Sequence, residues 1–144
     1  MSQRLQDKVA LITGGASGIG RECALKFATE GASVVVADLN PERADAVVDE
    51  AIAAGGQAIG IGVDTSQPEE VSSMIQGAVE KFGRIDVCVA AAGISHAAYV
   101  SREPDEQATA DRYDKGDMLL LNKSLENWQR VIDVNLTGVM LTNQ

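Results

Sequence analysis

The sequence predicts an α/β protein built on a doubly wound parallel sheet, and three observations favour this fold. Short, continuous apolar runs recur through residues 8–92, helical patterns separate them, and the first run ends in a glycine-rich turn. Continuous apolar strands are typical of parallel sheets that are covered on both faces. Right-handed crossovers convert this alternation of strands and helices into a doubly wound sheet.

Four segments are expected to be strands, namely residues 8–13, 33–38, 58–63 and 85–92. The second is rich in β-branched valine, which favours strands, whereas glycine dilutes the third. The expected order is strand, helix, strand, helix, strand, helix, strand, long loop and helix. This order is a truncated version of the doubly wound fold.

Three helices are expected between the strands, and a fourth is expected after Ser124. Asn40 before Pro41 predicts an N-cap with proline at the first helical position, and Ser66 with Glu69 predicts a capping box. The fourth pattern reaches the last residue without a C-cap, so we interpret the chain as a fragment that ends within a helix. The four apolar stripes comprise Ile19, Cys23, Ala24, Phe27 and Ala28; Ala44, Val47, Val48, Ala51 and Ile52; Val71, Met74, Ile75, Ala78, Val79 and Phe82; and Leu125, Trp128, Val131, Ile132, Asn135, Leu136, Val139 and Met140.

Residues 94–123 do not follow this pattern. The segment is polar, carries charges of both signs and closes with a short apolar patch at residues 118–121. A loop of this length is usually functional or disordered. We therefore interpret residues 94–123 as an extended loop within a single domain.

Composition and charge exclude several classes of protein. The 144 residues are 45% hydrophobic and 23% charged, which is ordinary for a globular protein, and no apolar run approaches the roughly 18 residues of a membrane span. The net charge of −9 argues against nucleic acid or an anionic membrane as a partner. His96 is the only histidine, so we expect no metal site and no histidine-based triad. Cys23 and Cys88 lack CxxC spacing and predict two buried thiols in a reducing cytoplasm.

The turn after the first strand reads TGGASGIG at residues 13–20. Gly14 permits a tight turn, Gly18 leaves no side chain between the backbone and a phosphate, and Gly20 lets the helix pack close to the sheet. Amide groups at the start of a helix favour an anion. The turn predicts a pyrophosphate site, with a purely structural turn as the alternative. The absence of GK[ST] excludes a nucleoside-triphosphate P-loop.

Carboxylates end the second and third strands. Asp38 can accept hydrogen bonds from adenosine ribose hydroxyls and repel a 2′-phosphate, and the adjacent Leu39 offers such a phosphate no basic partner. The alternative is an aspartate that merely ends a strand. Asp64, followed by Thr65, lies at the same edge and can accept from an adenine amino group. Both functions stay open for Asp64, because Asp-Thr-Ser also forms a good turn.

Five motifs in one order resemble the first half of a classical short-chain dehydrogenase/reductase. They are TGGASGIG, Asp38, Asp64, Ala-Ala-Gly at residues 91–93 and Val-Asn-Leu-Thr-Gly at residues 134–138. The resemblance covers residues 5–144 apart from the long loop. It implies a Rossmann fold with strand order 3-2-1-4-5-6-7, an NAD cofactor and hydride transfer between an alcohol and a carbonyl. Residues 1–144 are then the N-terminal part of one NAD(P)-binding Rossmann domain.

The resemblance also implies roles for individual residues. Ser17, Gly18 and Ile19 would contact the pyrophosphate and its neighbouring ribose, Asp38 the adenosine ribose, and Asp64 with Thr65 the adenine. Residues 90–93 read Ala-Ala-Ala-Gly where the family has Asn-Asn-Ala-Gly, which preserves backbone contacts to the cofactor but loses side-chain hydrogen bonds that steady the sheet. The implied cofactor-binding residues are Gly14, Ser17, Gly18, Ile19, Gly20, Asp38, Leu39, Asp64, Thr65, Ala90 and Gly93.

Asn135 matches the asparagine of the family's Asn-Ser-Tyr-Lys tetrad, which implies a catalytic role in holding a water for proton relay. It lies on an apolar stripe, where a buried amide needs partners, and an asparagine satisfied locally is the alternative. Tyr99 and Tyr113 precede Asn135 and lack a lysine four residues later. Neither is therefore the catalytic tyrosine, and the family's serine, tyrosine and lysine are not in this chain.

The resemblance implies an NAD(H)-dependent oxidoreductase that acts on a small-molecule alcohol or ketone. As the complete protein it is expected to form a homo-oligomer, either a tetramer or a dimer, in the cytoplasm. One alternative is a dinucleotide-binding module or regulatory sensor without catalysis. Another is a different Rossmann enzyme, such as a methyltransferase, which the GxxxGIG turn and the context of Asn135 argue against.

Overall fold

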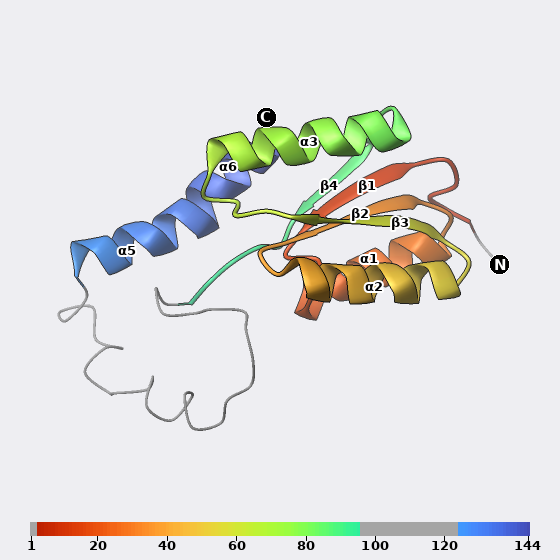
Figure 1. The fold of residues 1–144 in the computed structure, drawn as a ribbon, viewed down its shortest axis with the longest axis horizontal. Coiled ribbons are helices and arrows are strands. Elements are labelled where there is room, and N and C mark those ends of the chain that lie inside the picture. The colour runs from red at the N-terminus through yellow and green to blue at the C-terminus, as the bar shows by residue number, and fades with distance from the viewer. Residues whose placement is uncertain (1–2, 96–123) are drawn as a thin grey trace, which may run out of the picture.

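Four parallel strands form one sheet in the computed structural model, which describes residues 3–95 and 124–144. The strands are β1 (Val9–Thr13), β2 (Ser33–Asp38), β3 (Gln57–Gly62) and β4 (Val87–Ala90), in the order β3-β2-β1-β4. This arrangement confirms the predicted doubly wound fold (Figure 1). β4 is shorter than the expected 85–92, since it begins at Val87 and ends at Ala90.

Helices connect the strands and cover both faces of the sheet. The helices are α1 (Gly18–Thr29), α2 (Pro41–Ala53), α3 (Pro68–Phe82), α5 (Leu125–Ile132) and α6 (Gly138–Thr142), with a π-helix η2 (Asp133–Thr137) between the last two. The predicted N-caps of α2 and α5 are confirmed. The Asn40 side chain accepts from the amide of Arg43 at 3.2 Å, and the Ser124 hydroxyl accepts from the amide of Asn127 at 3.1 Å. No helix within the described residues is long and apolar enough to cross a membrane.

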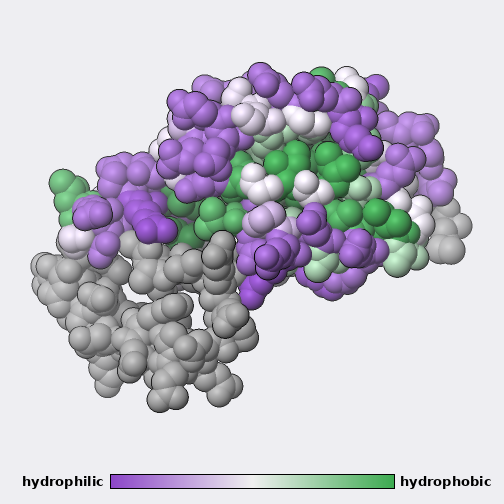
Figure 2. All heavy atoms as spheres, viewed as in Figure 1, coloured by the Kyte–Doolittle hydropathy of each residue, from purple (hydrophilic) through white to green (hydrophobic). Residues whose placement is uncertain are grey.

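The core consists of two apolar layers, one on each face of the sheet. Successive strand residues alternate between them, so Ile12 packs with α1 and α2 while Leu11 packs with α3. Figure 1 shows α1 and α2 on one side and α3 with α6 on the other. In Figure 2 hydrophobic residues gather between these two helical layers, whose outer surfaces are hydrophilic. The paired layers explain why the strands are continuously apolar.

The predicted capping box at the start of α3 is wrong. Helix α3 begins at Pro68, its N-cap is Gln67, and no side chain caps it. Asp64 instead accepts from both the amide and the hydroxyl of Ser66, at 2.9 and 2.7 Å. Proline is favoured at the first helical position, so Pro68 sets the start of the helix one residue later than a capping box would.

The last helical segment also differs from its prediction. The expected continuous α-helix is interrupted by η2, and Asn135 is exposed rather than buried. The two cysteines are free and only partly buried, and burial raises the pKa of the Cys88 thiol. Ile19 was assigned to a core stripe but is 79% exposed, because it lies in the first turn of α1 at the edge of the sheet. The predicted long loop at 94–123 lies almost wholly outside the described residues.

The apolar stripe from α5 to α6 leads to a prediction about association. Its members Leu125, Trp128, Leu136 and Met140 are 79, 47, 64 and 50% exposed, and exposed apolar patches promote association. We expect the purified chain to self-associate or to be poorly soluble despite its net charge of −9. Sedimentation velocity tests this expectation. A monomer that melts cooperatively above the usual mesophile range of roughly 45–65 °C would contradict it.

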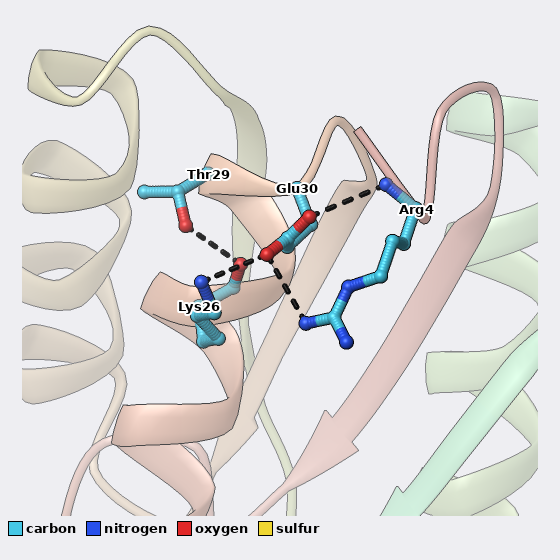
Figure 3. Close-up of polar contacts among 4 residues, drawn as sticks. All are labelled: Arg4, Lys26, Thr29 and Glu30. Atoms are coloured by element: carbon cyan, nitrogen blue, oxygen red, sulfur yellow. Dashed lines mark hydrogen bonds and ion pairs between the residues drawn. The ribbon is translucent and has the colours of Figure 1, made fainter. Parts of the chain in front are cut away.

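A buried carboxylate anchors the N-terminal segment to the end of α1 (Figure 3). Glu30 accepts from the Arg4 amide and guanidinium, each at 3.2 Å, and from the Lys26 ammonium at 2.8 Å. The hydrogen bond from Lys26, followed by those from Arg4, lowers the pKa of Glu30 from 4.5 to about 2. Ionised Glu30 therefore stabilises the folded chain.

The stabilisation by Glu30 should depend on pH in a defined direction. Its pKa is lower in the folded state, so the contribution is complete above pH 4.5 and is lost as the pH falls toward about 2. We expect Glu30→Gln to lower the melting temperature by a few degrees at pH 7 and to have no effect near pH 2. Thermal melts across this range measure the difference. Glu22→Gln on the same helix is the control, and an unchanged Glu30→Gln melt at pH 7 would contradict the prediction.

Candidate functional site

A cavity of about 770 Å³ lies at the carboxyl edge of the sheet. The segments that follow all four strands line it, and α5 and η2 form its remaining wall. The chain runs outward from β1 to β3 and then returns to place β4 on the other side of β1. Ligands of doubly wound proteins bind at such a reversal of strand order. The lining residues include Gly14, Ser17, Gly18, Ile19, Gly20, Asp38, Leu39, Asp64, Thr65 and Gly93.

The glycine-rich turn forms the floor of this cavity. Gly14 has a φ of +64°, and a Cβ there would lie 2.7 Å from the carbonyl oxygen of Ala91. Gly18 has a φ of +50° and open space where its side chain would be. Gly20 differs from its prediction, because a side chain there would collide with the backbone of Gly14, within the turn itself and not with the sheet. The turn is thus folded tightly on itself, and the space beside Gly18 is open to the cavity.

Asp38 ends β2 beneath the turn and is 7% exposed. One carboxylate oxygen accepts from the amide of Ala16 at 3.1 Å, and the other accepts from the amide of Asn40 at 3.0 Å. The carboxylate therefore connects the turn to the start of α2 and is held in one orientation while it lines the cavity. Leu39 beside it is 48% exposed at the same edge.

Asp64 and Thr65 follow β3 and form the far side of the cavity. The Asp64 carboxylate is engaged in the turn with Ser66, and the amide of Asp64 donates to the Glu70 carboxylate at 2.7 Å. The turn chemistry that the sequence left open for Asp64 is therefore present. Thr65 is 6% exposed and contacts α6, since a Cβ on Gly138 would lie 2.9 Å from the Thr65 carbonyl oxygen.

The segment after β4 is fixed by Thr13 in place of asparagine side chains. Ala90 is the last residue of β4, pairs with Thr13 and does not line the cavity. The amide of Ala91 donates to the Thr13 carbonyl at 3.1 Å, and the amide of Ala92 donates to its hydroxyl at 3.5 Å. Gly93 does line the cavity.

Asn135 lies in the π-helix and binds the main chain of Ile94. Its side-chain oxygen accepts from the Ile94 amide, and its side-chain nitrogen donates to the Ile94 carbonyl, both at 2.8 Å. Both ends of the amide are therefore satisfied across 41 residues of sequence. This arrangement holds the segment after β4 against η2. Single π-turns of this kind occur often at functional sites.

Sequence reasoning missed the wall that α5 contributes. Glu126, Gln129 and Arg130 line the cavity from one face of this helix, and Asp133 at the start of η2 continues that face. The signal was present as polar residues at three- and four-residue spacings opposite the apolar stripe. The apolar stripe by itself does not show that this polar face lines a cavity. Val63, Gln67 and Ile94 also line the cavity and were not predicted.

The arrangement fits a dinucleotide. Helix α1 begins at Gly18, and the Ser17 side chain does not cap it, so the amides of its first turn face the cavity without an internal partner. The open space at Gly18 admits a phosphate, and the Asp38 carboxylate lies at the next strand end. Within the described residues no cluster of histidine, cysteine or acidic side chains could hold a metal ion.

The family model for short chain dehydrogenases matches residues 8–144 of this chain. The chain belongs to the short-chain dehydrogenase family. Cyclohexanol dehydrogenase of Acinetobacter sp. is 40% identical over 139 residues, which are 96% of this chain and 48% of that protein. A 3-oxoacyl-[acyl-carrier-protein] reductase of Synechocystis sp. is 42% identical over 138 residues, which are 95% of this chain and 48% of the reductase.

Solved structures of short-chain dehydrogenases show the same architecture. A short-chain dehydrogenase/reductase from Mycobacterium marinum superimposes with a TM-score of 0.80 at 37% identity, covering 99% of this chain and 49% of that one. A 7α-hydroxysteroid dehydrogenase in complex with NADH and 7-oxoglycochenodeoxycholic acid gives 0.78 at 32% identity, covering 99% and 48%. The Rossmann-like fold is thus confirmed. The chain spans about half the length of the relatives that it matches.

Proposed function

We propose that this chain is the NAD(H)-binding part of a short-chain oxidoreductase that transfers hydride between a small-molecule alcohol and the corresponding ketone. The observation that carries the proposal is one continuous cavity that joins the open face of Gly18 to the Asp38 carboxylate at a reversal of strand order. The relative with bound NADH supports the choice of cofactor.

Each part of the cavity has a role in this proposal. The amides of Ser17, Gly18 and Ile19 bind the pyrophosphate, since they begin a helix and lie beside open space. Asp38 accepts from the adenosine ribose hydroxyls, and its two backbone hydrogen bonds fix the direction of its carboxylate. Asp64 and Thr65 flank the adenine. When bound, the nicotinamide supplies or accepts the hydride.

Asn135 is a positioning residue in this proposal. Its side-chain oxygen and one of its two side-chain N–H groups bind Ile94, which lines the cavity beside Gly93. The side chain therefore orients the segment after β4 and keeps one N–H group and one oxygen lone pair for a further partner. In the complete protein we place it within the family's tetrad, and we expect a homo-oligomeric enzyme of the cytoplasm.

A second candidate is a dinucleotide-binding regulatory module without catalysis. It is supported by the same cavity, because the open face of Gly18 and the Asp38 carboxylate can hold a dinucleotide without any catalytic group. Both candidates require the same cavity to bind a dinucleotide. The turnover experiment in the Discussion distinguishes them.

A matched pair of glycine variants tests the proposed pyrophosphate site. Gly18 and Gly55 both have positive φ angles and open space at the Cβ position, but only Gly18 lines the cavity. Gly18→Asp places a carboxylate beside the pyrophosphate, so we expect NADH affinity to fall by at least about 10-fold. Gly55→Asp imposes a similar backbone cost and should leave the affinity unchanged. Fluorescence titration with NADH gives both affinities.

Three outcomes would contradict the proposal. The unsubstituted chain would fail to bind NADH saturably, the two glycine variants would bind it equally, or S-adenosylmethionine would bind in preference. The last result would indicate the methyltransferase alternative.

A further inference from the structure

Helix α5 contributes a polar wall that the proposed function leaves without a role. The wall consists of Glu126, Gln129 and Arg130, continued by Asp133 at the start of η2, and each of these residues lines the cavity. Residues three and four positions apart lie on one face of a helix. Figure 1 shows α5 beyond the carboxyl ends of the strands, where it faces the segments that follow them. One side of this helix is thus directed at whatever the cavity holds.

Arg130 carries the single positive charge of the described lining. Asp133 accepts a hydrogen bond from the Gln129 side chain at 2.8 Å, which occupies that carboxylate. Among the described residues none forms an ion pair with Arg130, and its side chain is exposed. Within the part of the chain that the structure describes, the guanidinium is therefore available to a ligand. The charged residues that line the cavity are Asp38, Asp64, Glu126, Arg130 and Asp133.

The position of Arg130 along the cavity follows from the packing of the same helical segment. Gly138 contacts Thr65, so this part of the segment is pressed against the turn after β3. Val134 and Arg130 lie one and two turns before Gly138, and both line the cavity. The proposed function places the adenine beside Asp64 and Thr65. Val134 and Arg130 therefore line the cavity at the end where the adenine would lie.

We propose that Arg130 closes over the adenine of the bound dinucleotide, with its guanidinium stacked on the face of the base. This inference rests on the proposed function. A guanidinium is planar and weakly hydrated, so it stacks on aromatic faces more readily than an ammonium group. Val134 supplies an apolar neighbour one turn along, and Asp64 and Thr65 also line the cavity. The contact discriminates ligands by their base and involves no reacting atom.

The test compares ligands with and without the base. NADH and ADP-ribose contain adenine, whereas reduced nicotinamide mononucleotide lacks it. We expect Arg130→Met to weaken NADH and ADP-ribose binding by about 3- to 10-fold and to leave binding of the mononucleotide unchanged. Arg130→Lys should give an intermediate loss, because it keeps the charge without the plane. Lys81→Met, at the far end of α3, makes the same change of charge away from the cavity and should bind as the unsubstituted chain does.

Calorimetric titration of the full chain provides the affinities, and circular dichroism verifies that each variant is folded. Equal NADH affinity for Arg130→Met and the unsubstituted chain would overturn the inference and leave the proposed function intact. A loss that is equal for NADH and the mononucleotide, or complete retention by Arg130→Lys, would also overturn the stacked contact. Failure of the unsubstituted chain to bind either adenine ligand would overturn the proposed function and the inference with it.

Discussion

Purified residues 1–144 should show no enzyme-like oxidation of NADH in the presence of ketones. The family resemblance implies that proton transfer and substrate orientation fall to a serine, a tyrosine and a lysine that follow the helix of Asn135, and we expect these residues to lie outside residues 1–144. General acid–base catalysis typically contributes roughly 10²–10⁴-fold to rate, and orientation of the reactants contributes more. Asn135, the one matching member of the tetrad, is bound at both ends by Ile94. Among the described residues no tyrosine lines the cavity.

The measurement is a spectrophotometric assay with a panel of ketones. Residues 1–144 are compared with the same protein extended to its natural C-terminus. Turnover by the longer protein alone would support the oxidoreductase proposal. Comparable turnover by both would show that the catalytic groups lie within these 144 residues, and binding without turnover by either would favour the regulatory module.

The complete protein should prefer NADH over NADPH by about 5- to 150-fold. A 2′-phosphate next to the Asp38 carboxylate costs on the order of 1–3 kcal/mol. The structure strengthens this expectation, because hydrogen bonds from Ala16 and Asn40 prevent the carboxylate from turning away. The neighbouring Leu39 offers the phosphate no positive charge.

Separate affinities for NADH and NADPH provide the test. Asp38→Asn should reduce the preference, although it also disturbs one of the two backbone hydrogen bonds, because its amide nitrogen cannot accept. Asp45→Asn, on the exposed side of α2, removes the same charge and should leave the preference unchanged. Equal affinity of the unsubstituted protein for both cofactors would show that Asp38 does not select between them.

Local signals in the sequence were sufficient for most of the fold. Apolar runs identified all four strands, because both faces of the sheet are covered and every strand position can be apolar. Asn40 and Ser124 were identified as N-caps, since a cap depends on residues within one turn. The glycine-rich turn and Asp38 were assigned to one edge, because parallel strands bring their carboxyl ends together.

Competing contacts, some local and some distant in sequence, explain what the sequence did not reveal. Ser66 appeared to cap α3, but Asp64 takes its hydroxyl and Pro68 determines the start of the helix. Asn135 appeared buried on an apolar stripe, whereas its partner is the main chain of Ile94, which no periodicity identifies. Arg130 was overlooked because a polar residue on an amphipathic helix ordinarily faces solvent, and only the folded chain shows that this face lines a cavity.

The π-helix changes the direction in which the residues after it point around the helix axis, relative to the residues before it. In an α-helix, residues four positions apart drift steadily around the axis, because one turn contains 3.6 residues. The wider turn at Asp133–Thr137 advances each residue by a smaller angle and offsets that drift. Arg130 can thus face the cavity while Gly138, eight residues later, still meets Thr65. A regular α-helix that is one residue shorter would also keep both contacts, because seven steps of about 100° make nearly two full turns. The π-helix therefore accommodates one additional residue without changing the direction of either contact.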